Sequence, residues 1–311
     1  MTATLLYWGP DDTRAARWQA LFAARAPSIT FRRSDDPGDA ADVDYLLSWQ
    51  PPDDILGRFP SLRAIFATSA GVDQFDLAAI PERVPVVRMF DPQIEAGVVE
   101  YASTAVLYLH REFDRYRHQQ HTRAWMPHAP LPATARRVGI LGLGSLGRAI
   151  ARRLVTLGFE VLGWARSAHT LPGVACFQEE DGLARMLAVT DILICMLPLT
   201  EATRGMLDRS LFEQLPRGAC LVNMGRGGHL VEADLSAALD DGILRGAVLD
   251  VLDSEPPAPD HPFWSDPRIL LTPHIAAMTN PDTAFDVLMA NIERDRKGEA
   301  MIGRVDRWRG Y

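Results

Sequence analysis

Three glycines, Gly142, Gly144 and Gly147, constrain the fold of this chain more than any other feature. They lie between the apolar residues 138–141 and an amphipathic stretch, so a loop is expected there between a buried strand and a helix. In such a loop the first glycine makes the tight turn, the second lets a pyrophosphate approach the backbone, and the third lets helix and strand pack closely. The pattern therefore predicts a dinucleotide-binding loop that consists of Gly142, Leu143, Gly144, Ser145, Leu146 and Gly147.

Short apolar runs alternate with helical patterns along the chain, which is typical of a parallel α/β fold. The runs in the second half are almost continuously apolar, as expected for strands that are covered on both faces. We expect strands at 4–8, 29–33, 45–49, 62–68, 84–89, 138–143, 160–165, 174–177, 192–197, 219–224, 247–252 and 269–272. One long helix is expected over 95–117 and another from 281 to about 297.

The length of 311 residues suggests two domains, at roughly 150 residues per domain. The last helix and the tail are too short to form a domain, so we expect them to pack on the first one. The predicted fold is α/β, with a Rossmann-type dinucleotide domain (95–284) inserted into a flavodoxin-like α/β domain (1–94 plus 285–311).

The charge balance excludes several classes of partner. The chain has 32 basic and 40 acidic residues and a formal net charge of −8, which disfavours a nucleic-acid or anionic-membrane binder. No run approaches the ~20 apolar residues of a membrane span, and the N-terminus lacks the features of a signal peptide. Three cysteines are too few for a disulfide framework, so we expect a cytoplasmic protein without a membrane partner.

The end of the run at 160–165 indicates which dinucleotide binds. A carboxylate at this position would bind the ribose 2′-hydroxyl of NAD. The chain instead has Trp164, Arg166 and Ser167 there, and a guanidinium can pair with a 2′-phosphate while a serine hydroxyl donates to it. The sequence therefore predicts NADP(H) in preference to NAD(H).

Three charged or titratable residues follow predicted strands of the second domain, namely Arg226, Glu255 and His274. Ligands of open parallel sheets bind beyond the carboxyl ends of the strands, so all three are expected near one crevice. Histidine can protonate the oxygen of a carbonyl group during hydride transfer, a carboxylate can orient the imidazole, and arginine can bind a substrate carboxylate. We therefore predict a carbonyl reductase with His274 as proton donor, Glu255 as its partner and Arg226 as the substrate-binding group.

The segments 142–147, 197–203, 223–227, 250–256 and 272–276 resemble motifs of the D-isomer-specific 2-hydroxyacid dehydrogenase family. The resemblance implies NADPH-dependent reduction of small 2-oxo acids, such as glyoxylate and hydroxypyruvate, to glycolate and D-glycerate. It assigns the catalytic roles to Arg226, Glu255 and His274. The departure from the broad family is at Ala165 and Arg166, because its NAD-dependent members have an acid there.

Further roles are implied only by this resemblance. The first domain would bind substrate through Trp49 and the backbone N–H groups of Ala70 and Gly71, together with Arg226 and His274. The inserted domain would bind NADP and contribute, with its long helix, to a homodimer. The residues implied to lie along the cofactor are Leu197, Pro198, Thr203, Asn223, Met224, Gly225, Asp250 and Ala276.

Two other functions stay open at this point. One is a reductase of a larger 2-oxo acid, which would differ in pocket size. The other is a non-catalytic protein that senses NADP and acts through partner binding, against which the complete set of three catalytic residues argues. Four histidines between 110 and 128 lie close together, but no carboxylate or cysteine completes a metal site with them, so we predict no metal.

Overall fold

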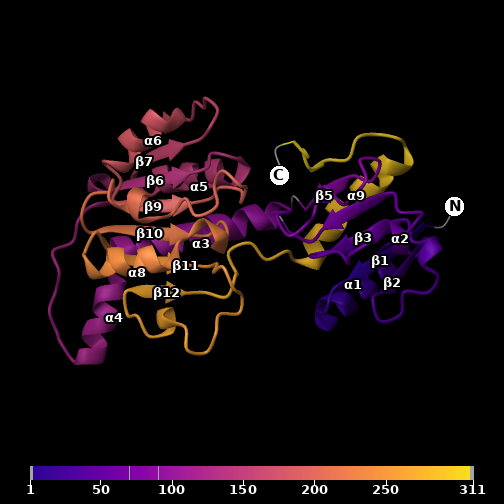
Figure 1. Ribbon diagram of the computed structural model, residues 1–311, viewed down its shortest axis with the longest axis horizontal. Coiled ribbons are helices and arrows are strands. Elements are labelled where there is room, and N and C mark those ends of the chain that lie inside the picture. The colour runs from indigo at the N-terminus through magenta and orange to yellow at the C-terminus, as the bar shows by residue number, and fades with distance from the viewer. Residues whose placement is uncertain (1–2, 70, 90, 309–311) are drawn as a thin grey trace. The chain divides into compact units, whose positions relative to one another are not determined.

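The computed structural model describes residues 3–69, 71–89 and 91–308 (Figure 1). The chain divides into two compact units, Met1–Ile94 with Ala277–Tyr311, and Glu95–Ala276. The predicted boundary at 284 is too late in the sequence. The hydroxyl of Thr279 donates to the carbonyl oxygen of Thr68 at 2.8 Å, and Asn280 donates to Gln93, so these residues already belong to the first unit.

The first unit contains a five-stranded parallel sheet in the order β2-β1-β3-β4-β5, which is the flavodoxin-like order predicted for it. Its strands are β1 (Ala3–Trp8), β2 (Ile29–Arg33), β3 (Tyr45–Ser48), β4 (Ala64–Ala67) and β5 (Val86–Arg88). Its helices are α1 (Asp12–Arg25), α2 (Ile55–Arg58) and α9 (Pro281–Arg296), with a 3-10 turn at Ala40–Asp42.

The C-terminal segment completes the core of this first unit. Phe285 of α9 lies against Trp18 and Phe22 of α1, with ring centroids 6.4 and 5.1 Å away. Further along, the amide of Val305 donates to the carbonyl oxygen of Val86 at 2.9 Å. Apolar burial of this kind is the main stabilising term in folding, so the last helix and the tail belong to the first unit.

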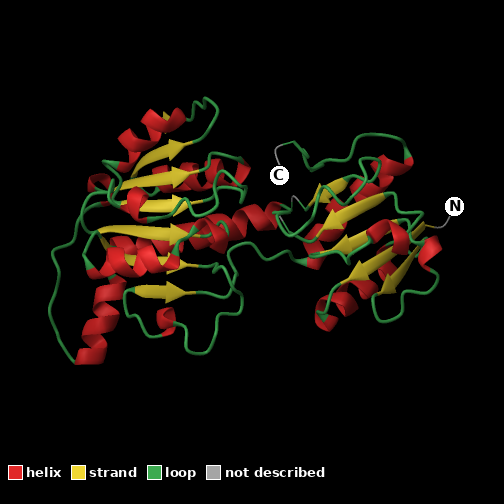
Figure 2. Ribbon diagram, in the orientation of Figure 1, coloured by secondary structure: helices red, strands yellow, loops and turns green. Residues whose placement is uncertain are grey.

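The second unit contains a seven-stranded parallel sheet, β12-β11-β10-β9-β6-β7-β8 (Figure 2). Its strands are β6 (Arg137–Leu141), β7 (Glu160–Trp164), β8 (Val174–Phe177), β9 (Ile192–Cys195), β10 (Ala219–Asn223), β11 (Leu244–Leu249) and β12 (Ile269–Leu271). The strand order reverses between β6 and β9, and a doubly wound sheet binds its ligand at such a switch point. The glycine loop follows β6 and therefore begins at this point, which confirms the Rossmann-type fold.

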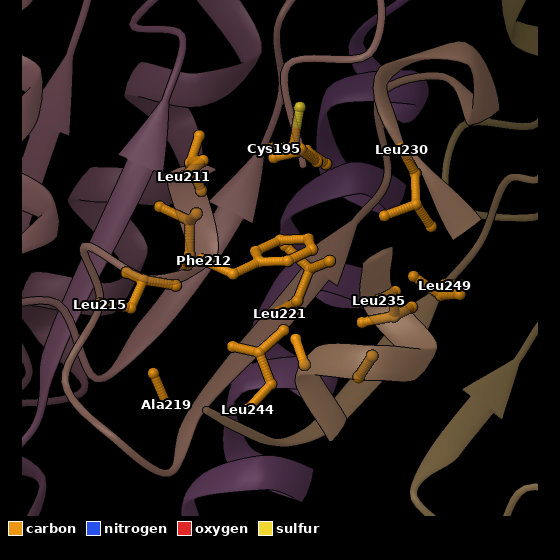
Figure 3. Close-up of a cluster of buried hydrophobic side chains, with 14 of the residues drawn as sticks. Cys195, Leu211, Phe212, Leu215, Ala219, Leu221, Leu230, Leu235, Leu244 and Leu249 are labelled. Atoms are coloured by element: carbon orange, nitrogen blue, oxygen red, sulfur yellow. The ribbon is translucent and has the colours of Figure 1, made fainter. Parts of the chain in front are cut away.

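The helices of the second unit are α3 (Pro92–His110, of which the second unit contains the residues from Glu95), α4 (Phe113–Thr122), α5 (Ser145–Thr156), α6 (Glu179–Leu187), α7 (Arg209–Phe212) and α8 (Glu232–Asp240). The 3-10 turns are Ala133–Ala135, Gly227–His229 and Pro262–Trp264. Figure 3 shows the ring of Phe212 among leucines from β10, β11 and α8, in a buried cluster that fixes these strands. Within the described ranges no helix is long and apolar enough to cross a membrane.

Two sequence predictions about this unit were wrong in detail. The helix expected over 95–117 is broken into α3 and α4 at Glu112, which adopts φ +56° and pairs with Arg115 at 2.9 Å. The strand expected at 247–252 is β11, which begins at Leu244, because the charge of Arg245 is neutralised inside the unit by Asp114 at 2.5 Å. The residues from 250 onward therefore form a loop beyond the carboxyl end of the strand.

Candidate active site

The predicted catalytic residues lie on three loops at the same edge of the seven-stranded sheet. Arg226 follows β10, Glu255 lies in the loop after β11, and His274 follows β12. These three strands are neighbours and run parallel, so their carboxyl ends meet at one edge. The structure thus brings together three side chains that are 48 residues or less apart in a sequence of 311, as their numbers show.

His274 and Glu255 form a hydrogen-bonded pair, with 2.8 Å between Nδ1 and Oε2. The second oxygen of Glu255, Oε1, accepts from the amide of Leu252 at 3.0 Å. Burial raises the pKa of the Glu255 carboxyl, but the hydrogen bonds from His274 and Leu252 and the charges of His274 and Arg226 outweigh it. The pKa of Glu255 therefore lies below its ordinary value. An ionised carboxylate only accepts, so Nδ1 of His274 carries a proton and its Nε2 faces away from Glu255.

The backbone of His274 is in an unusual conformation that Asp250 supports. His274 has φ +53°, in the left-handed region that costs free energy for a side chain with a Cβ. The amide of His274 donates to the carbonyl oxygen of Asp250 at 2.8 Å, and the carboxylate of Asp250 accepts from the amides of Ile275 and Ala276, both at 2.8 Å. Because Asp250 is almost fully buried, these hydrogen bonds hold the loop in one conformation.

A hydroxyl chain extends this support to α3. The hydroxyl of Thr272 donates to Asp250 Oδ1 at 2.6 Å, and it lies 2.6 Å from the hydroxyl of Tyr101. Desolvation by burial raises the pKa of Tyr101 well above its ordinary value, which keeps this phenol neutral. The loop of His274 is thus fixed by groups from the loop after β11 and from α3, a helix far away in the sequence.

The loop of Arg226 is held by residues that are close to it in the sequence. The side-chain amide of Asn223, which is fully buried, donates to the carbonyl oxygen of Arg226 at 3.0 Å and accepts from the amide of Gly225 at 3.3 Å. A Cβ on Gly227 would lie 1.9 Å from the carbonyl carbon of Leu252. Only glycine therefore lets this loop pack directly on the loop that carries Glu255.

The three glycines of the predicted dinucleotide loop have the three predicted geometries. Gly142 has φ +102°, which a side chain rarely adopts, and makes the turn. A Cβ on Gly147 would lie 1.9 Å from the carbonyl oxygen of Gly142, so α5 packs directly on the turn. A Cβ on Gly144 would meet no described atom within 4 Å, and no described side chain caps α5 at this residue. The first-turn amides of α5 are therefore suited to an anion such as a pyrophosphate.

The predicted 2′-phosphate residues lie at the end of β7. Trp164 ends the strand, and its indole nitrogen donates to the carbonyl oxygen of Glu179 at 2.8 Å. Arg166 and Ser167 are both exposed in the loop that follows. The Ser167 hydroxyl lies 3.3 Å from Nε2 of His169, a neighbour that the sequence analysis did not single out.

The other predicted cofactor residues fall into two structural groups. Leu197, Pro198 and Thr203 form the loop after β9, which the hydroxyl of Thr203 closes by donating to the carbonyl oxygen of Pro198 at 2.7 Å. The second group is buried at the carboxyl edge of the sheet and supports the loops described above, while its contact with a cofactor stays a prediction. This group comprises Asn223, Met224, Gly225, Asp250 and Ala276.

The predicted substrate residues of the first unit follow β3 and β4. Trp49 comes directly after β3 and is half exposed. The carbonyl oxygen of Gly71 accepts from the Ser69 hydroxyl at 2.6 Å, whereas Ala70 lies outside the described residues. Gln74 donates to the carbonyl oxygen of Trp49 at 2.7 Å and to Ser69 at 3.1 Å, so it joins the two loops. Their role in substrate binding stays a prediction.

Sequence reasoning missed Gln74, Tyr101, His169 and His229. Only His229 carried a local signal, since it stands three residues after Arg226, the spacing at which a side chain can reach back to a backbone amide. Among the residues that the structure describes, no group of three or more histidine, cysteine, aspartate or glutamate side chains could hold a metal ion.

Comparison with known proteins identifies the class to which such a site belongs. The model of the family described as "D-isomer specific 2-hydroxyacid dehydrogenase, NAD binding domain" matches residues 103–276, within the second unit. The protein is a dinucleotide-dependent oxidoreductase, and the chain belongs to the D-isomer specific 2-hydroxyacid dehydrogenase family.

Individual relatives are similar over almost the whole chain. A protein of Yersinia enterocolitica named glyoxylate/hydroxypyruvate reductase A is 39% identical over 303 residues, which cover 96% of each chain. A D-isomer specific 2-hydroxyacid dehydrogenase from Xanthobacter autotrophicus Py2, solved in complex with NADPH and MES, superimposes with a TM-score of 0.93 at 36% identity over the full length of both chains. An NADPH-dependent glyoxylate/hydroxypyruvate reductase from Sinorhizobium meliloti, solved with NADP and sulfate, has a TM-score of 0.92 at 32% identity over the same coverage.

Proposed function

We propose that this protein reduces small 2-oxo acids, above all glyoxylate and hydroxypyruvate, to glycolate and D-glycerate with NADPH. The observation that carries the proposal is the 2.8 Å hydrogen bond between His274 and Glu255, on the loop that packs against the loop of Arg226. Relatives of nearly the same length that bear the name glyoxylate/hydroxypyruvate reductase A support the choice of substrates.

The residues of the second unit fit NADP(H). The open space at Gly144 and the uncapped first turn of α5 suit the pyrophosphate. Arg166 and Ser167 are exposed where the 2′-phosphate is expected, and the segment 164–167 has no carboxylate to repel it. The binding of NADPH or NADP by similar proteins supports the preference for NADP(H) over NAD(H). When bound, the reduced dinucleotide supplies the hydride.

In the proposed mechanism each catalytic side chain has a distinct role. The Arg226 guanidinium binds the carboxylate of the 2-oxo acid and polarises its carbonyl group. His274, protonated on both ring nitrogens, donates the proton of Nε2 to the carbonyl oxygen as negative charge develops there. Glu255 accepts the hydrogen bond from Nδ1, which orients the ring and stabilises its charged form before the transfer. Trp49, Ala70 and Gly71 would contribute to the substrate side of the site.

We also propose that the protein is a homodimer. Large apolar side chains are exposed on the second unit between α4 and β6, and Trp125, Met126 and Leu131 are 98, 62 and 48% exposed. Exposed aromatic and apolar side chains of this size are typical of protein interfaces. Light scattering after size exclusion tests this proposal, because a homodimer has twice the chain mass of 34.4 kDa. Three free cysteines favour a reducing compartment, so we place the protein in the cytoplasm, which cell fractionation can check.

The oxidation of NADPH and of NADH with glyoxylate and with hydroxypyruvate tests the reaction directly. We expect turnover of either acid, faster with NADPH than with NADH. If neither acid were reduced but a larger 2-oxo acid were, the substrate assignment would be wrong. If a broad panel of 2-oxo acids gave no turnover although NADPH bound, the protein would be an NADP-sensing protein instead of a reductase.

A further inference from the structure

The imidazole of His229 lies in the loop of Arg226, and the proposed mechanism gives it no task. His229 ends the 3-10 turn Gly227–His229 and is fully buried. Its Nδ1 accepts from the backbone amide of Arg226 at 3.1 Å, and it also lies 3.1 Å from the carbonyl oxygen of Arg226. Its Nε2 lies 3.3 Å from the carbonyl oxygen of Pro198. The ring therefore spans the distance between the loop of Arg226 and the loop after β9.

The partners of the two ring nitrogens indicate which one carries the proton. A carbonyl oxygen only accepts, so Nε2 must donate to Pro198. In a neutral imidazole Nδ1 is then unprotonated, and it can accept from the amide of Arg226. The carbonyl oxygen of Arg226 is as close to Nδ1 as the amide is, but the amide can donate only to an unprotonated nitrogen, so the geometry points to a neutral ring with its proton on Nε2.

The surroundings of the ring leave it little freedom to move. A Cβ on Gly225 would lie 3.2 Å from His229 Nδ1 and 3.3 Å from the carbonyl oxygen of Leu197, so glycine lets both close on the loop. From the other side, the amide of Leu207 donates to the carbonyl oxygen of His229 at 2.8 Å. A buried ring that is hydrogen bonded at both ends and fixed through its own backbone is a rigid connection.

We propose that His229 is a positioning residue that sets the place of Arg226 relative to the loop of Leu197, Pro198 and Thr203. This inference rests on the proposed function, in which Arg226 binds the substrate carboxylate and that loop lies along the cofactor. The carbonyl carbon of the 2-oxo acid must be held at a fixed distance from the hydride donor. A displacement of about 1 Å can lower the reaction rate about 100-fold. His229 would maintain this distance without touching substrate.

Three substitutions separate the two contacts of the ring. His229→Ala removes both. His229→Asn places an amide oxygen close to the position of Nδ1 and can still accept from Arg226, whereas His229→Gln places its amide close to Nε2 and can still donate to Pro198. His110→Asn is the matched control, because His110 is a buried histidine of the same unit that packs on Phe159, at the start of β7 and at the opposite edge of the sheet.

We expect His229→Ala to lower kcat/KM for glyoxylate about 10- to 100-fold, with a raised KM for glyoxylate. His229→Asn should recover most of the KM for glyoxylate. His229→Gln should recover the dissociation constant of NADPH, measured by fluorescence titration without substrate, more than the KM for glyoxylate. His110→Asn should lower the melting temperature but leave both constants at wild-type values.

A measurement on the protein without ligands tests the contact itself. In ¹⁵N NMR spectra, His229 should show a protonated Nε2 and an unprotonated Nδ1. The amide of Arg226 should exchange slowly with solvent in the wild type and in His229→Asn, and fast in His229→Ala.

The outcomes keep the two proposals apart. A wild-type protein that reduces no 2-oxo acid refutes the proposed function, and this is known before any variant is compared. A wild type that reduces glyoxylate, combined with a His229→Ala variant of equal kcat/KM, refutes the positioning role alone. A loss that His229→Asn does not recover at all would also refute it, because then the ring would only fill space.

Discussion

The loops that carry Arg226 and His274 leave the same edge of one sheet, but they are held in place by different means. The loop of Arg226 is held by residues that lie within a few positions of Arg226, namely Asn223, Gly225, Gly227 and His229. The loop of His274 is held by Asp250, Glu255 and, through Thr272, by Tyr101, which come from other elements. The difference shows that one of the two proposed catalytic groups is fixed mainly by residues near it in the sequence, whereas the other depends on the assembled sheet.

The loop after β11 connects the two. It contains Asp250 and Glu255, and β11 lies between β10 and β12 in the sheet. The amide of Asp250 donates to the carbonyl oxygen of Asn223 at 2.9 Å, and the amide of His274 donates to the carbonyl oxygen of Asp250 at 2.8 Å. The relative position of His274 and Arg226, the proposed acid and the proposed carboxylate-binding group, is therefore determined by this central loop.

The largest effect is expected from removal of the acid itself. His274→Ala should lower kcat for glyoxylate about 10²- to 10⁴-fold, because it removes the proposed proton donor, while the dissociation constant of NADPH changes little. His261→Ala is the control, since His261 forms a similar pair with Glu232 at 3.0 Å. Near-wild-type turnover of His274→Ala would show that His274 is not the proton donor.

The second-largest effect is expected from substitution of the buried carboxylate of Asp250. Asp250→Asn puts a donor where two amides and a hydroxyl donate, so it should lose hydrogen bonds worth about 1.5–3 kcal/mol each. We expect a lower melting temperature and a lower kcat, measured by calorimetry and NADPH oxidation. Asp253→Asn, at an exposed position of the same loop, should change neither. If both variants behaved alike, the loop of His274 would not depend on Asp250.

Addition of a methyl group between the loop of Arg226 and the central loop should lower stability and activity somewhat less than Asp250→Asn does. Gly227→Ala forces the backbone of Leu252 to move and should cost about 1–3 kcal/mol of stability, together with much of the activity. In the adjacent Gly228→Ala variant the nearest atoms to the new methyl group belong to the side chains of Arg204 and Leu199, which can move. Equal unfolding free energies for the two variants, measured in urea, would contradict the close contact between the loops.

The pH dependence of stability tests the hydrogen-bonded pair of Glu255 and His274. The pKa of Glu255 in the folded protein lies below its ordinary value of 4.5, so the ionised carboxylate stabilises the fold above pH 4.5. This contribution is lost as the pH falls below 4.5. In Glu255→Gln the decrease of the melting temperature between about pH 5 and pH 3 should be less steep than in the wild type. Parallel profiles would mean that the pair does not hold the loop.

The smallest effect is expected at the far end of the hydroxyl chain. Tyr101→Phe removes one hydrogen bond to Thr272 and should cost about 0.5–1.5 kcal/mol of stability, with kcat reduced only a few-fold. Tyr108→Phe, at another position of α3, serves as the control. A large loss of kcat in Tyr101→Phe alone would show that the His274 loop depends on α3 more than on Asp250.

Features that depend on neighbouring residues could be predicted from the sequence, whereas features that depend on contacts between distant segments could not. The glycine loop and the positions of Arg226, Glu255 and His274 after their strands are visible as local patterns, and the structure has each of them as expected. Tyr101 and Thr272 are 171 residues apart, and no local pattern connects two such positions. The break at Glu112 and the start of β11 at Leu244 were missed for a related reason. Besides its local pair with Arg115, Glu112 pairs with Arg136 at 3.7 Å, and Arg245 of β11 pairs with Asp114, so both features depend on ion pairs between distant segments.

The contacts of Phe285 with Trp18 and Phe22 have a consequence for the order in which the chain folds during synthesis. Residues 3–94 are translated before the second unit, but the helix that completes their core is translated only after it. The second unit is contiguous and can fold as soon as it has emerged, since domains generally fold as units. The unit whose strands are translated before the second unit is thus completed after it, and until then its apolar face around Trp18 is available to chaperones.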